Sequence, residues 1–91
     1  MPNERVRDRY PNRLREFRER ALLTRVEFAK KSELLAAGDP HTHRFISHET
    51  LRNLEGGFTR PRLSTARTIA AVLGVPAELL FPAGFDSGNR H

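Results

Sequence analysis

The sequence contains no cysteine, so neither a disulfide framework nor a thiolate metal site contributes to its stability. It also has no apolar run near the roughly 20 residues of a membrane-spanning helix. The N-terminal MPNERVRDRY carries charge where a signal peptide needs its apolar stretch. We therefore expect a cytoplasmic protein without membrane contact. Its 91 residues suffice for one compact domain and not for a second core.

Motifs of catalysis are missing as well, namely GxSxG, a P-loop, GxGxxG and a carboxylate pair placed with a histidine. We therefore expect no enzyme, no catalytic residue and no cofactor. His41 and His43 are close enough in sequence to share a metal ion, but they lack a carboxylate or cysteine at a recognisable spacing. We interpret them as loop histidines that lie in solvent or touch phosphate when protonated, and we expect no metal site.

Positive charge is abundant. Sixteen Lys+Arg residues oppose eleven Asp+Glu, which gives a formal net charge of +5. Two of these residues are lysines, Lys30 and Lys31, and the other fourteen are arginines. The planar fork of arginine pairs bidentately with phosphates and guanine edges. The composition favours a polyanionic partner, although a basic pI also keeps a small protein soluble.

Apolar periodicity predicts five helices and no strand. The expected ranges are 12–21, 25–37, 48–55, a fourth helix that Ser64 caps and Gly74 ends, and a short fifth helix with Pro76 at its first position. The second helix is expected to begin with a capping box of Thr24 and Glu27. This helix is expected to have a broad buried side, formed by Val26, Phe28, Ala29, Leu34 and Leu35.

The chain outside these helices reads as loop. Ser47 is expected to cap the third helix, and Gly56-Gly57 to end it before a basic loop. We divide the chain into an arm (1–11), one domain (12–82) and a loose tail (83–91). The run ERVRDRYPNRLR fits two interpretations, an arm that follows the DNA backbone and a solvated extension of the first helix.

Four stretches resemble the Xre/Cro family of phage-repressor-like helix-turn-helix domains: Leu14, Phe17 and Arg18, then TRVEFA, ISHETLRNLEGG and RPRLSTARTIAAVLGVPAELLF. The resemblance covers about residues 13–81. It implies an all-α, five-helix, lambda-repressor-like fold. The second and third helices would form the helix-turn-helix, the third would lie in the major groove of double-stranded DNA, and the protein would be a homodimer.

The resemblance also implies roles for individual residues. Those that would face base edges are His48, Glu49, Asn53 and, beside them, Arg52. Those that would contact the sugar-phosphate backbone are Thr24, Arg25, Gly57, Phe58, Thr59, Arg60 and Arg62. Arg18 and Glu55 would form a structural ion pair. Glutamate, arginine and asparagine can read cytosine, guanine and adenine, but Glu49 and Arg52 are also spaced as an ordinary surface pair.

Two features depart from the family pattern. Leu22 stands where the family commonly has glycine. An insertion at about residues 36–46 replaces the tight turn before the third helix, and it could alter docking or add a contact with DNA or another subunit.

The sequence therefore predicts a sequence-specific DNA-binding protein, a repressor-like transcriptional regulator associated with the nucleoid. The chief alternative is an antitoxin or accessory protein-interaction module on the same fold. A nonspecific nucleic-acid binder is a more distant alternative, because the Glu49 carboxylate would weaken nonspecific binding.

Overall fold

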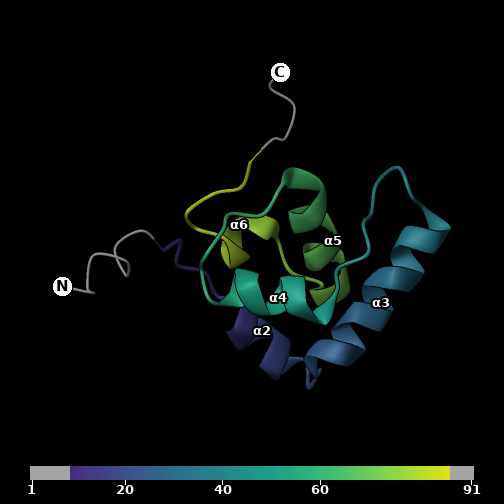
Figure 1. Cartoon of the computed structure of the whole chain (residues 1–91), viewed down its shortest axis with the longest axis horizontal. Helices are drawn as coiled ribbons and strands as arrows, with labels where there is room; N and C mark the ends of the chain where they lie inside the picture. The colour runs from purple at the N-terminus through teal and green to yellow at the C-terminus, as the bar shows by residue number, and fades with distance from the viewer. Residues whose placement is uncertain (1–8, 87–91) are drawn as a thin grey trace.

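A computed structural model describes residues 9–86 of the protein, which form five helices and no extended strand (Figure 1). The helices are α2 (Leu14–Arg20), α3 (Arg25–Gly38), α4 (His48–Glu55), α5 (Leu63–Leu73) and α6 (Ala77–Leu80). α4 contacts α2 and α3, and α5 contacts α3 and α6. The prediction of an all-α, five-helix fold is confirmed. None of these helices is long and apolar enough to cross a membrane.

Side-chain caps determine where α3 and α4 begin. Thr24 Oγ1 accepts a hydrogen bond from Glu27 N at 3.1 Å, and the Glu27 carboxylate accepts one from Thr24 N at 2.8 Å. This is the predicted capping box. The hydrogen bond from the Thr24 backbone, followed by that from its hydroxyl, holds the pKa of Glu27 below its ordinary value. Ser47 Oγ accepts from Thr50 N at 3.1 Å, so α4 begins at His48 as predicted.

The core is one apolar cluster to which every helix contributes. Its buried members are Leu14, Phe28, Ile46, Leu51, Leu54, Ala66, Ile69, Leu80 and Phe81. The buried residues of α3 are Phe28, Ala29 and Ser32, whereas Val26 is 53% exposed and Leu34 is 73% exposed. At about 100° per residue, Val26 and Leu34 point about 160° and 120° away from Phe28. The prediction that both are buried is therefore wrong, because α3 packs mainly against α4 and α5, along a narrower stripe than its apolar residues suggest.

The last two helices begin differently from the prediction. α5 starts at Leu63, and Ser64 does not cap it. The Leu63 N–H instead donates to the Asp86 carbonyl at 2.5 Å, so a residue distant in sequence satisfies the helix end. Pro76 precedes α6, whose first residue is Ala77.

The segment after α6 is ordered as far as the structure describes it. Phe85 packs against the core, and the Asp86 N–H donates to the Pro61 carbonyl at 2.8 Å. Residues 83–86 of the expected tail therefore contact the rest of the domain through Phe85 and Asp86. Residues 87–91 lie outside the described part of the chain.

The segment at residues 36–46, before α4, is fixed to α3 and α5. Its first residues continue α3, and the rest forms a loop, as predicted. The Ile46 N–H donates to Ser32 Oγ at 2.8 Å, and the Arg44 N–H donates to Thr68 Oγ1 at 2.9 Å. Ser32 lies on α3 and Thr68 on α5, so hydrogen bonds tie the loop to both helices. In Figure 1 this loop rises from the end of α3 and then descends between α3 and α5 to the start of α4.

The turn between α2 and α3 contains strained backbone. Leu22 has a φ of 60°, a left-handed conformation that side chains with a Cβ rarely adopt. Its side chain is 87% exposed, so it gains little packing there. The turn thus keeps a glycine-like conformation without a glycine.

Candidate nucleic-acid interface

α4 has one buried side and one exposed side. Leu51 and Leu54 are 0% and 3% exposed and hold the helix on the core. The four side chains expected to face base edges are all exposed: His48, Glu49, Arg52 and Asn53. Among the ion pairs of residues 9–86, none joins Glu49 to Arg52, although their spacing allows one. Their hydrogen-bonding groups therefore face solvent and are available to a ligand.

A buried carboxylate fixes α4 against the two preceding helices. The Glu55 side chain is 3% exposed, and its Oε2 lies 2.5 Å from Arg18 Nε. Its Oε1 lies 3.0 Å from Arg25 Nη2. Arg18 also donates to the Leu23 carbonyl at 2.7 Å. The structure thus brings Arg18 and Glu55 together and adds Arg25, which links the first turn of α3 to the end of α4.

Gly57 shapes the loop after α4. Its φ of 78° suits glycine, and a Cβ there would lie 2.9 Å from the Tyr10 carbonyl oxygen. Its N–H donates to the Leu54 carbonyl at 3.0 Å, and its carbonyl accepts from Tyr10 N at 2.8 Å. Because Gly57 is buried and both of its backbone groups have partners, it does not present a group to phosphate. A contact of Gly57 with the DNA backbone would therefore not use its N–H, which already donates to the Leu54 carbonyl.

The other loop residues expected to contact phosphate are exposed: Phe58, Thr59, Arg60 and Arg62. The Phe58 ring lies against Gly56, where an added Cβ would come within 2.5 Å of it. The Arg9 guanidinium lies 4.4 Å from the centroid of the same ring. Arg60 forms an ion pair with Asp86 at 2.7 Å, so one carboxylate already partly neutralises it.

Residues before α2 support this loop. Asn12 Nδ2 donates to the Leu54 carbonyl at 2.8 Å, while its Oδ1 accepts from Leu14 N at 3.0 Å. Asn12 therefore accepts a hydrogen bond from the first N–H of α2 and satisfies a carbonyl at the end of α4 at the same time. The first interaction joins residues 42 apart in sequence, so no local pattern indicated it. Of the expected arm, residues 9–11 lie against this loop, and residues 1–8 lie outside the described range.

The loop histidines have different surroundings. His41 is exposed, whereas His43 is half-buried with its Nδ1 3.2 Å from Thr68 Oγ1. The interpretation that both lie in solvent is therefore wrong for His43. Within residues 9–86, no three His, Cys, Asp or Glu side chains gather as they would around a metal ion.

A family model described as a helix-turn-helix domain matches residues 12–80. The chain belongs to this family of helix-turn-helix domains. The matched range includes all five helices of the described structure. No curated protein and no solved structure matched the chain.

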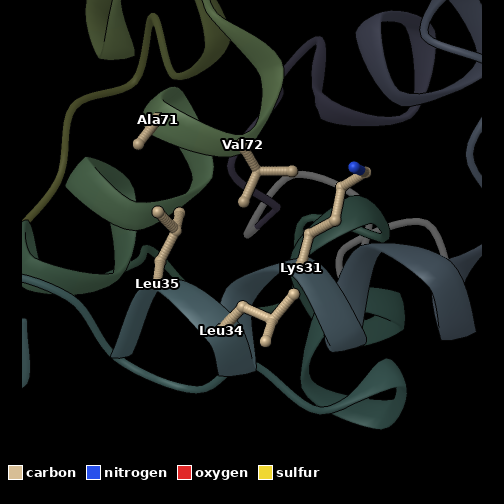
Figure 2. Close-up of a pocket in the computed structure, with 5 residues that line it drawn as sticks. All are labelled: Lys31, Leu34, Leu35, Ala71 and Val72. Carbon is tan, nitrogen blue, oxygen red and sulfur yellow. The ribbon is translucent and has the colours of Figure 1, made fainter. Parts of the chain in front are cut away.

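The helix-turn-helix domain has a second exposed feature, an apolar hollow of about 320 Å³ between α3 and α5. The residues that line it are Lys31, Leu34, Leu35, Ala71 and Val72 (Figure 2). Leu35 extends from α3 toward Ala71 and Val72 of α5, whereas Leu34 lies beside Lys31 on α3 (Figure 2). None of these residues belongs to the set expected to contact DNA. The hollow is thus a separate apolar surface.

Proposed function

We propose that this helix-turn-helix domain is a sequence-specific double-stranded DNA-binding protein, a repressor-like transcriptional regulator of the Xre/Cro type. α4 enters the major groove and chooses the bases. The observation that carries the proposal is the exposed side of α4, where Arg52 and Asn53 present guanine- and adenine-reading groups on a helix held by buried leucines and by Glu55. The protein acts by binding, not by catalysis.

The residues divide by role. Those that face base edges are His48, Glu49, Arg52 and Asn53. Those that contact the DNA backbone are Thr24, Arg25, Phe58, Thr59, Arg60 and Arg62. The N-terminus of α3 favours anions, because unpaired N–H groups and the helix dipole both attract negative charge there. Phosphate contacts set the register, and α4 supplies the specificity.

We propose further that the protein acts as a homodimer on the nucleoid, in the cytoplasm. The two α4 helices then meet half-sites about one helical turn, or roughly 34–36 Å, apart. Sedimentation equilibrium with and without DNA measures this stoichiometry, and a single copy on each half-site with no coupling between sites contradicts it.

Selection from randomised duplexes tests DNA reading. The expected result is an enriched consensus, bound with an affinity that falls steeply with salt because phosphate contacts release counterions. Arg25→Gln and Arg60→Gln each make that salt dependence shallower. Arg20→Gln serves as the control, since Arg20 pairs with Glu16 on α2 and is not assigned to DNA. Selection without a consensus, together with binding only at low salt, would contradict the proposal.

A protein-interaction module on the same fold is the second candidate function. The observation that favours it is the apolar hollow between α3 and α5, beside the 73% exposed Leu34. The salt titration distinguishes the two functions, because a module that binds only protein shows no steep salt-dependent affinity for any duplex.

A further inference from the structure

A basic hollow of about 410 Å³ lies at the C-terminal end of α4, where that helix meets α2 and α3. Arg15 comes to it from α2, Arg25 from α3, and Arg52 and Asn53 from α4. Glu55 is the one carboxylate among its described lining residues. Nothing in the sequence indicated that Arg15 lies beside the exposed side of α4.

The hollow carries excess positive charge. The single charge of Glu55 is shared, because one oxygen lies 2.5 Å from Arg18 Nε and the other 3.0 Å from Arg25 Nη2. Among residues 9–86, Arg52 forms no ion pair. Arg15 pairs with Glu19 at 3.0 Å, but these side chains are 68% and 55% exposed. Exposed pairs contribute little, so Arg15 can exchange its carboxylate for another anion.

The unused donors of the arginines suit a tetrahedral anion. A guanidinium has five N–H donors. Arg25 donates its Nε hydrogen to Glu55 at 3.1 Å, and its Nη2 lies 3.0 Å from the same oxygen, which leaves its Nη1 group without a hydrogen-bond partner in the described residues. Arg15 donates its Nε hydrogen to Glu19, so both of its Nη groups remain available to donate to an anion. Two forks from different helices can therefore donate to the same phosphate from two directions.

We propose that this hollow binds one phosphate group of the DNA backbone and that Arg15 is a ligand of that phosphate. The inference rests on the proposed DNA-binding function and adds a binding residue from α2 to it. Because Asn53 lines the same hollow, the bound phosphate lies next to the base pair that Asn53 reads. A phosphate held at this place fixes the C-terminal end of α4 relative to the groove.

Duplexes that carry a single methylphosphonate test the proposal. Each duplex has the selected consensus, and one backbone phosphate at a time is replaced by the neutral group. Their affinities are measured for the wild type, Arg15→Gln, Arg25→Gln and Arg20→Gln. Arg20 is the matched control, because it also lies on α2 in an exposed i,i+4 ion pair but does not line the hollow.

On the unmodified duplex, Arg15→Gln is expected to bind several-fold more weakly, with the plot of log affinity against log salt shallower by about 0.9. One methylphosphonate should weaken the wild type but have little effect on Arg15→Gln or Arg25→Gln, because the contact is already lost. Arg20→Gln should follow the wild type at every position. All four proteins should select the same consensus, since phosphate contacts carry no sequence information.

The proposal is overturned if Arg15→Gln keeps the wild-type salt dependence and the wild-type response to every methylphosphonate. A second pair of results also overturns it. Inorganic phosphate raises the melting temperature of the wild type but not of Arg15→Gln, and every methylphosphonate duplex binds the wild type as tightly as the unmodified duplex does. The hollow would then bind a free anion and not a phosphate of the DNA backbone. If selection yields a consensus but Arg15→Gln binds DNA like the wild type, only this inference is refuted, and the proposed DNA-binding function stands. Shallower salt dependence for Arg15→Gln without any consensus refutes sequence reading and leaves the phosphate site standing.

Discussion

Replacing Glu55 should strongly destabilise the domain. The Arg18 and Glu55 side chains are 9% and 3% exposed, so Glu55→Leu leaves the Arg18 guanidinium in the interior with the Leu23 carbonyl as its remaining acceptor. Removing one partner of a buried ion pair costs about 3–5 kcal/mol. Small domains have roughly 5–15 kcal/mol of total stability, so this variant loses a large part of it. Arg25, whose side chain is 36% exposed, should contribute at most about 1 kcal/mol.

Urea unfolding at neutral pH, followed by helical circular dichroism, measures these differences. Glu55→Leu and Arg18→Met should each be strongly destabilised, whereas Arg25→Gln stays close to the wild type. The double variant Arg18→Met/Glu55→Leu should recover most of the loss, because it buries no unpaired charge. If the double variant is no more stable than Glu55→Leu, or if Glu55→Leu costs less than about 1 kcal/mol, the buried pair does not hold α4 as described.

Three further changes have defined outcomes. Leu22→Gly should raise the free energy of unfolding by about 0.5–1 kcal/mol, since glycine relieves the left-handed strain at some cost in backbone entropy, and a destabilised variant would contradict this. Glu27→Gln should be less stable than the wild type at neutral pH and approach it as pH falls through the carboxyl range, because the pKa of Glu27 is lowered in the folded state; a pH-independent difference in urea unfolding would refute it. Asp86→Asn should raise the affinity for DNA about threefold, because it frees Arg60 from its ion pair. Fluorescence anisotropy titrations measure this affinity, and an unchanged or lower value would exclude the effect.

Local signals made the helix starts predictable. The capping box at Thr24 and the cap at Ser47 involve residues within one helical turn, so the sequence identified both starts correctly. The start of α5 was not predictable in this way. A serine suited to capping stands at Ser64, but the carbonyl of Asp86 satisfies the preceding N–H through a contact from a distant part of the chain.

The buried side of α3 could not be predicted from the sequence. Its apolar residues lie on several sides of the helix, so periodicity does not select the one that packs. The packing of the neighbouring helices determines which side is buried, and it leaves Leu34 exposed, where it lines the apolar hollow. In α4, by contrast, Leu51 and Leu54 define a single apolar side, and the exposed residues follow from helical geometry.

The surroundings of α4 depend on contacts between distant residues. Arg15 stands on α2 in a run of alternating charges that reads as a solvated surface, and only the packing of α2 against α4 brings it to the basic hollow. The sequence likewise indicated Asn12 only as the start of a helix and gave no sign of its hydrogen bond to the Leu54 carbonyl. The position of residues 36–46, before α4, could not be predicted from the sequence either, since their hydrogen bonds to Ser32 and Thr68 follow no periodic pattern.

The most direct test of DNA reading by α4 is the affinity of the wild type and of Asn53→Ala for the selected duplex and for duplexes changed at one base pair at a time. Asn53→Ala should lose about 1–3 kcal/mol of preference at a single base position and keep the wild-type dependence on salt. The same base preferences in both proteins, or a uniform loss of affinity on every duplex, would contradict the assignment of α4 as the element that reads the DNA sequence.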